Sequence, residues 1–304
     1  MKRHAAQTLQ SLGEDRLIAE LTHNLRQAGN VRVGVGDDCA VIGKPRDARW
    51  TLLKTDAIVE GIHFTSGEDM RRAGWKALCR TISDVAAMGG VPEHALVTLA
   101  LPVETEVRRV KDFYEGLRKA ARRFEVSIVG GETSRSPGPF FCSIALTGWV
   151  ERQRCLLRSG GKPGDAIYVT GRLGGSFDSG RHLDFIPRLV EARWLAAGFK
   201  IRSMMDLSDG VASDLPRLAR TSGCGFELWE DQLPKHRGCT TAQALQDGED
   251  FELLFTLAPR EGERLEPAWR KQFPKTPLTR IGTLLAPSRS RAAQSTGRGF
   301  DHFA

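Results

Sequence analysis

Residues 71–92, RRAGWKALCRTISDVAAMGGVP, contain the clearest helix signal in the chain together with its stop signal. Apolar side chains recur there at spacings of three, four and three, which predicts an amphipathic helix over residues 71–88. These side chains are Trp75, Leu78, Ile82 and Val85. The run Gly89-Gly90-Val91-Pro92 ends the helix, because glycine favours the C-terminal cap and proline cannot continue the hydrogen bonding. The pair Ser83-Asp84 stands close to this junction.

Short apolar runs separated by turn residues flank this helix and are typical of β-strands. They are TLLKTDAIVEGIHF (51–64), ALVTLALP (95–102), VSIVGG (126–131) and FCSIALTGWV (141–150). Residues 14–27 and 104–124 have helical patterns. From residue 51 onward, the order strand, helix, strand, helix, strand, strand predicts a mixed α/β domain that ends near residue 150.

A second α/β unit is predicted beyond that boundary. AIYVTGRLGGS (166–176) is typical of a strand followed by a Gly-rich turn, and ELLFTL (252–257) of another strand. Residues 208–223 predict a helix capped by Ser208 and Asp209. A single core stops growing at roughly 250–300 residues, so a chain of 304 residues is expected to form two domains. The predicted domains are residues 1–150 and 151–304.

Composition and charge exclude several classes of protein. Hydrophobic residues make up 40% of the chain and charged residues 27%, as in a soluble globular protein. The net charge of +7 is spread evenly, since residues 1–150 carry 21 basic and 18 acidic side chains and the rest carry 23 and 19. Nucleic-acid binding needs clustered cations and is not expected. The six cysteines form no CxxC pair, and neither a membrane-spanning run nor an apolar signal core is present, which predicts a cytoplasmic protein with reduced thiols.

Acidic residues stand beside Gly, Ser or Thr at the ends of many predicted segments. The junctions are Gly36-Asp37-Asp38, Thr55-Asp56, Ser83-Asp84, Gly130-Gly131-Glu132-Thr133, Asp206-Leu207-Ser208-Asp209-Gly210 and Gly248-Glu249-Asp250. Each one alone is explained by a turn or a helix cap. If they converge, cations must neutralise the carboxylates, and oxygen ligands without Cys or His suit Mg²⁺ bridged to phosphates. The pattern therefore indicates Mg²⁺-nucleotide chemistry, without the Lys-Ser/Thr of a P-loop or a GxGxxG turn.

Eight blocks in order along nearly the whole chain resemble thiamine-monophosphate kinase, a family of the aminoimidazole-ribonucleotide-synthetase-like ATP-binding superfamily. They are GVGDDCAVI (34–42), LLKTDAIVEGIHF (52–64), ISDVAAMGGVP (82–92), IVGGETSR (128–135), LLRSGGKPGDAIYVTGRLGGS (156–176), MDLSDGVASDL (205–215), DGEDFELLFT (247–256) and GFDHF (299–303). The resemblance implies an α/β fold of two domains, in which the N-terminal domain pairs with its twin in a homodimer, forming a barrel. It also implies ATP and several Mg²⁺ ions in the cleft between the domains, with thiamine monophosphate as the acceptor.

The resemblance also assigns roles to individual residues. Metal ligands would be Asp38, Thr55, Asp56, Asp84, Glu132, Asp206 and Asp209. ATP contacts would be Tyr114, Gly131, Glu132, Arg158 and Ser208, and the acceptor would meet His63, Glu249 and Phe300. Among these, the residues expected to act in catalysis are Asp56, Asp84, Asp209 and Arg158. Without the resemblance, the sequence pattern explains Tyr114 equally well as a residue that packs its helix, and His63 as a loop histidine with a satisfied hydrogen bond.

The chain departs from the family pattern at two positions and in one segment. Glu132 stands where the family usually has Asp, and Lys54 where it commonly has Ser or Thr. The segment between Gly175 and Asp206 is shorter than usual. Two alternatives stay open: another synthetase of the superfamily, similar to aminoimidazole ribonucleotide synthetase, or a Mg²⁺-nucleotide binding protein that has lost catalysis. Whether the tail, residues 286–304, orders over the substrate is also open.

Overall fold

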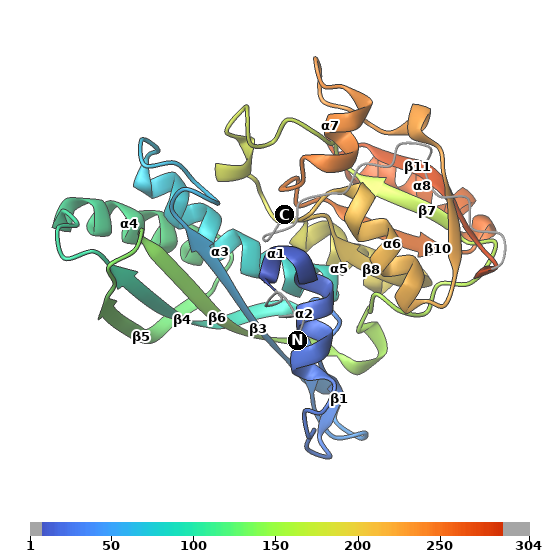
Figure 1. Cartoon of the computed structure of the whole chain (residues 1–304). Coiled ribbons are helices and arrows are strands. Elements are labelled where there is room, and N and C mark those ends of the chain that lie inside the picture. Colours follow the sequence, from blue (N-terminus) through green and yellow to red (C-terminus); the bar gives the residue numbers. More distant parts are fainter. Residues whose placement is uncertain (1–7, 288–304) are drawn as a thin grey trace, which may run out of the picture.

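The computed structural model describes residues 8–287, which form two α/β parts side by side (Figure 1). The N-terminal part is built on a six-stranded sheet in the order β1-β2-β3-β6-β4-β5. Its strands are β1 (Val31–Val33), β2 (Ala40–Ile42), β3 (Arg49–Val59), β4 (Val91–Leu101), β5 (Ser127–Arg135) and β6 (Phe141–Glu151). The pairs are antiparallel except for β4 with β5, which α4 connects as a parallel crossover. The predicted mixed α/β class is thereby confirmed.

Two helices, α3 (Met70–Ala87) and α4 (Val107–Arg123), cover one face of this sheet. They pass very close to one another. A Cβ atom at Gly74 of α3 would lie 1.9 Å from the backbone oxygen of Phe113, and one at Gly116 of α4 equally close to that of Arg71. Glycine at both positions therefore lets the two backbones touch. The apolar side chains predicted along one side of α3 are buried.

The strands of this sheet have two unlike faces. Along β3, Leu52, Lys54 and Asp56 turn toward the helices, whereas Leu53 and Thr55 turn to the opposite face. We call this opposite face the open face, because helices α3 and α4 do not cover it. Its side chains include Leu96, which is 48% exposed although it is a large apolar residue in the middle of β4.

The C-terminal part is a five-stranded antiparallel sheet in the order β8-β10-β7-β11-β9. Its strands are β7 (Ala166–Thr170), β8 (Ile201–Asp206), β9 (Gly225–Leu228), β10 (Leu253–Leu257) and β11 (Leu278–Leu285). Helices α6 (Val211–Thr221) and α7 (Thr241–Gln246) pack on one face, and α5 (Leu189–Gly198) and α8 (Pro259–Gln272) on the other. The hydrophobic core beneath α5 and α8 also includes Ala86 of α3. The end of α3 therefore packs against the C-terminal part.

Several expected boundaries were wrong. The helix expected over residues 14–27 is α2 (Glu14–Thr22), preceded by the single turn α1 (Leu9–Leu12), and the strand expected over residues 51–64 stops at Val59. Residues 171–188 hold only a short 3₁₀ turn, Arg181–Leu183, and two similar turns, Arg152–Arg154 and Glu230–Gln232, lie elsewhere. Most of the tail, residues 288–304 with Phe300, lies outside the described residues.

The helix α6 begins differently from the expectation. Gly210, and neither Ser208 nor Asp209, occupies the N-cap position. The side chain of Asp214 instead accepts hydrogen bonds from the backbone N–H groups of Ser208 and Asp209, at 3.1 and 3.0 Å. Ser208 and Asp209, which the sequence predicted as the cap of the helix, are therefore held in place by Asp214, one turn inside it.

Candidate active site

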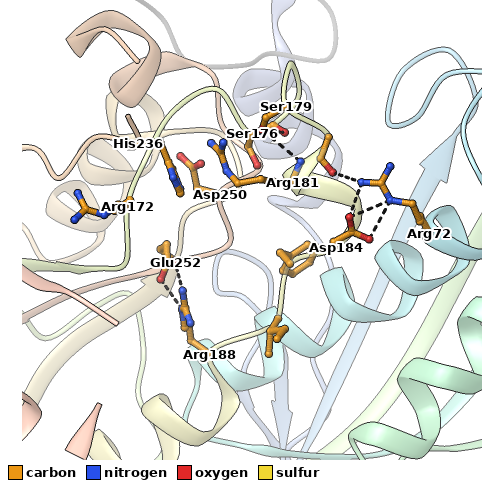
Figure 2. A pocket seen from close by; sticks show the side chains of 13 residues that line it. Arg72, Arg172, Ser176, Ser179, Arg181, Asp184, Arg188, His236, Asp250 and Glu252 are labelled. Atoms are coloured by element: carbon orange, nitrogen blue, oxygen red, sulfur yellow. Dashed lines mark hydrogen bonds and ion pairs between the residues drawn. The ribbon is translucent and has the colours of Figure 1, made fainter. Parts of the chain in front are cut away.

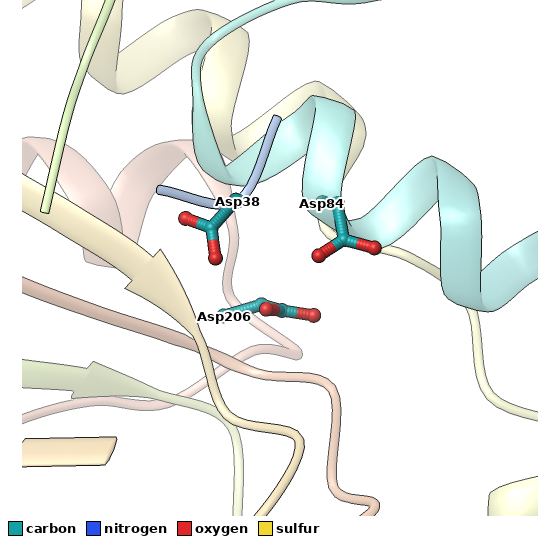
Figure 3. A group of neighbouring side chains, drawn as sticks. All are labelled: Asp38, Asp84 and Asp206. Carbon is teal, nitrogen blue, oxygen red and sulfur yellow. The ribbon is translucent and has the colours of Figure 1, made fainter. Parts of the chain in front are cut away.

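Three buried carboxylates from distant segments converge where the two parts meet (Figure 3). Asp38 lies in the turn before β2, Asp84 in the last turn of α3 and Asp206 at the end of β8. One oxygen atom of each lies within 4.8 Å of those of the other two. Burial, reinforced by the neighbouring carboxylates, raises the pKa of Asp84 well above its usual value despite the opposing effect of Lys54. Burial and the charge of Asp38 likewise raise the pKa of Asp206 to about 6.

Each member of this carboxylate cluster has one fixed partner. Arg158 contacts Asp38 through its Nε and Nη2 atoms, at 3.0 and 2.5 Å. The ammonium group of Lys54 lies 2.8 Å from Asp84 Oδ1. The hydroxyl of Ser83 donates a hydrogen bond of 2.6 Å to Asp206.

One fully buried oxygen of the cluster has no hydrogen-bond partner within the described residues. Asp38 Oδ2 is buried and accepts no hydrogen bond within the described part of the chain. A buried carboxylate oxygen without a partner is costly, and a cation is the partner that suits it. Three convergent carboxylates with a free oxygen therefore fit a hard divalent ion such as Mg²⁺.

A second set of predicted residues lies beside the cluster. Asp56 is paired with Arg80, whose Nε lies 3.1 Å from Asp56 Oδ2, and Asp209 is paired with Arg217. Asp37, which was named from the sequence only as part of the junction Gly36-Asp37-Asp38, also lies here. It accepts a hydrogen bond of 3.1 Å from the backbone N–H of Arg158, and burial together with the charge of Asp38 raises its pKa to about 7.

Other predicted residues do not meet the carboxylate cluster within one chain. Thr55 points to the open face, where its hydroxyl lies 3.2 Å from that of Ser143. Glu132 lies on β5, three strands away from β3, which is roughly 14 Å at the usual strand spacing. Gly131 precedes it, and a Cβ atom there would lie 1.8 Å from the backbone oxygen of Val97. Tyr114 packs against the core beneath α4.

Two of the residues expected to meet the acceptor, His63 and Glu249, lie in a separate buried network. Glu249 is held by Lys76, whose Nζ lies 2.5 Å from Oε2, and by His182, whose Nδ1 lies 3.0 Å from the same oxygen. Lys76 also donates to the backbone oxygen of His63, at 2.6 Å. Burial tends to raise the pKa of Glu249, but His182, Lys76 and Arg80 outweigh it and lower that pKa to about 2. Burial lowers the pKa of Lys76 to about 8, against the effect of Glu249.

Sequence reasoning missed Lys76, Arg80 and His182 as site residues. A signal for the first two was present, because they stand four residues apart on a helix whose neighbouring positions are apolar. A charged pair at that spacing on a buried helix needs buried partners. His182 gave no such signal, since its turn reaches Lys76 only through the tertiary fold.

Two cavities adjoin these networks. One of about 540 Å³ lies between α2 and α6, and its lining includes Asp37, Lys54, Arg158, Asp209 and Arg217. The other, of about 340 Å³, is shown in Figure 2. Its wall carries two ion pairs, Arg72 with Asp184 and Arg188 with Glu252. The first cavity has the size of a small-molecule site and opens beside the carboxylate cluster.

Comparison with known proteins agrees with this fold. The family model described as "AIR synthase related protein, N-terminal domain" matches residues 36–150, which contain the six-stranded sheet except β1. The N-terminal part of the chain thus belongs to the class related to AIR synthase.

Within this class, the chain belongs to the thiamine-monophosphate kinase family. It is 39% identical to the thiamine-monophosphate kinase of Rhodopirellula baltica, over 90% of this chain and 89% of the relative, and 31% identical to that of Bacillus subtilis, over 94% and 98%. A solved structure, AaThiL complexed with AMPPCP and TMP, superposes with a TM-score of 0.82 at 29% identity and covers 98% of this chain and 100% of its own. None of the helices within residues 8–287 has the length and apolar character needed to cross a bilayer.

Proposed function

We propose that this protein phosphorylates thiamine monophosphate with ATP, giving thiamine diphosphate and ADP. The observation that carries the proposal is the buried cluster Asp38, Asp84 and Asp206, with its unpartnered oxygen, beside a cavity of nucleotide size. Its relatives from Rhodopirellula baltica and Bacillus subtilis carry the name of this kinase, and the superposed AaThiL holds AMPPCP and TMP.

The cavity beside the cluster is the proposed nucleotide site. Arg158 supplies a guanidinium group at its wall, and such a group suits phosphate oxygens. Ser208, in the loop that Asp214 holds, is proposed as a further ATP contact. His63 and Glu249, together with Phe300 of the tail, are proposed to hold the acceptor.

The residues that would hold Mg²⁺ are Asp38, Asp84 and Asp206, with Asp56 and Asp209 at the margin. When bound, the ion would neutralise charge on the transferring phosphoryl group.

The chain's own contribution is positioning and charge. A phosphate oxygen of thiamine monophosphate forms the new bond to the γ-phosphorus, and the bond from that phosphorus to the bridging oxygen of ADP breaks in line with it. The acceptor is an anion at neutral pH, so no side chain has to remove a proton. Arg158 would stabilise the negative charge that develops on the transferring phosphoryl group. Asp56, Asp84 and Asp209 would hold the reacting groups in position.

The proposal extends to assembly and location. The open face of the N-terminal sheet, with Leu53 and Leu96, is proposed to pair with the same face of a second copy, which closes two sheets into a barrel. Thr55 and Glu132 would then lie at the dimer interface, and Gly131 and Tyr114 are kept as proposed ATP contacts. We also propose that the two parts are separate domains, 1–150 and 151–304, and that the protein works in the cytoplasm.

Release of ADP that depends on thiamine monophosphate tests the activity. Wild-type protein should turn over, and Asp84→Asn should keep its fold by circular dichroism while losing at least a hundredfold in rate. Binding of ATP without turnover in the wild type would favour the degenerate alternative. Turnover only with another acceptor would favour a different synthetase of the class.

A further inference from the structure

Lys54 lies within the carboxylate cluster, on the strand that also carries Asp56. The alternation of β3 turns both side chains to the helix-covered face. The Nζ atom of Lys54 lies 2.8 Å from Asp84 Oδ1, and only 23% of its side chain is exposed. Lys54 also lines the 540 Å³ cavity. Its ammonium group thus stands between the cluster and the proposed nucleotide site.

The charges of this region show what Lys54 does there. Asp38 has Arg158 as its cation and Asp56 has Arg80. Within the described chain, Lys54 is the cation that is paired with Asp84. A Ser or Thr in its place would leave Asp84 buried without a charge partner, which is unfavourable unless another cation enters.

Lysine is suited to replace such an ion. An ammonium group is a compact point charge with three donors, whereas a guanidinium group is a planar fork. It can therefore meet a carboxylate on one side and a phosphate oxygen on the other, as a metal ion does. The chain supplies this charge permanently, with no binding equilibrium.

We infer that the ammonium group of Lys54 takes the place of one divalent ion beside Asp84. This inference rests on the proposed function, because it concerns the cations that accompany the nucleotide. The wild-type chain then binds one ion fewer, with nucleotide present, than a variant that has a hydroxyl group at position 54.

The experiment counts Mn²⁺ ions bound per chain in the presence of AMPPCP, using electron paramagnetic resonance to measure free Mn²⁺. Lys54→Ser is expected to bind one ion more than wild type. Lys54→Arg, which keeps the charge, and Lys111→Ser, which removes an exposed lysine of α4, should both keep the wild-type count. Equal counts in wild type and Lys54→Ser would overturn the inference.

A second measurement does not depend on nucleotide. In excess chelator, Lys54→Gln should unfold at a lower temperature than wild type, and Mg²⁺ should raise the melting temperature of the variant by more. An equal response to Mg²⁺ would contradict the inference even if Lys54→Ser does not fold. Turnover of thiamine monophosphate by the wild type is measured alongside, and its absence would refute the proposed function while the ion count still tests Lys54.

Discussion

The ammonium group of Lys76 lies 2.5 Å from the carboxylate of Glu249, although the two residues are 173 positions apart in the chain. Lys76 is fully buried on α3, and Glu249 sits in the loop before β10 with a left-handed φ of 52°. A non-glycine residue keeps that conformation only when its surroundings hold it. The contact therefore fixes the loop of the C-terminal part against the helix that carries Asp84.

Replacing Glu249 by Gln should lower the free energy of unfolding by an amount that depends on pH within a defined window. The pKa of Glu249 is lowered to about 2 in the folded state, so its contribution is complete above the unfolded value near 4.5 and is lost as pH falls from there toward 2. The free energy of unfolding of the wild type should exceed that of Glu249→Gln by on the order of 3 kcal/mol at pH 7, and by much less at pH 2.

Urea unfolding of both proteins across this range measures the difference. Glu263→Gln, at an exposed position of α8, is the matched control and should show no such window. A constant difference from pH 7 to pH 2 would contradict the role given to Glu249.

Replacing Asp206 by Asn should stabilise the protein in excess chelator. The folded pKa of about 6 lies above the usual 3.8, so the folded state binds protons more tightly and loses stability as pH rises through this interval. At pH 8 the free energy of unfolding of the variant should be higher than that of the wild type by on the order of 2–3 kcal/mol. This difference should shrink between pH 6 and pH 4.

Thermal unfolding at several pH values tests this, with the exposed Asp178→Asn as control. Added Mg²⁺ should stabilise the wild type more than Asp206→Asn. If the variant is less stable than wild type at pH 8 without metal, the repulsion assigned to the cluster is wrong.

Replacing Gly74 by Ala should disturb both stability and activity. The added Cβ would lie 1.9 Å from the backbone oxygen of Phe113, so α3 and α4 must move apart. We expect a loss of about 2–3 kcal/mol, typical of overpacking. The rate of turnover should fall as well, because α3 carries Lys76, Arg80 and Asp84.

Gly198→Ala is the matched control for this change. Gly198 ends α5, and a Cβ atom there would meet nothing within 4 Å. Its replacement should be neutral or stabilise by up to about 1 kcal/mol, because alanine restricts the unfolded chain. Equal effects of the two substitutions would show that the helices are not in tight contact.

Replacing Leu96 by Arg should abolish the proposed homodimer. Leu96 lies on the open face in the middle of β4, and a charge buried between two sheets without a partner is unfavourable. Light scattering coupled to size exclusion should give a dimer for wild type and a monomer for Leu96→Arg. Val103→Arg, in the exposed loop after β4, should remain a dimer. A monomeric wild type would refute this mode of pairing.

Local patterns in the sequence determined much of the N-terminal part. The apolar spacing of α3 and the short runs around it predicted the helices and strands from residue 51 to 150, because each signal depends on side chains a few positions apart. Strands β8, β9 and β11 were not predicted. Their pairing partners lie far along the chain, and their own residues do not alternate clearly.

The sequence by itself determined which carboxylates were available, since acidic residues beside glycine at segment ends marked Asp38, Asp84 and Asp206. Only the tertiary structure decided which of them meet, because their convergence depends on how α3 packs against the C-terminal sheet. The same packing put Lys76 and His182 on Glu249, and the pleat of β3 separated Thr55 from Asp56. Burial then set the charge of these groups, and burial is a property of the fold rather than of any segment.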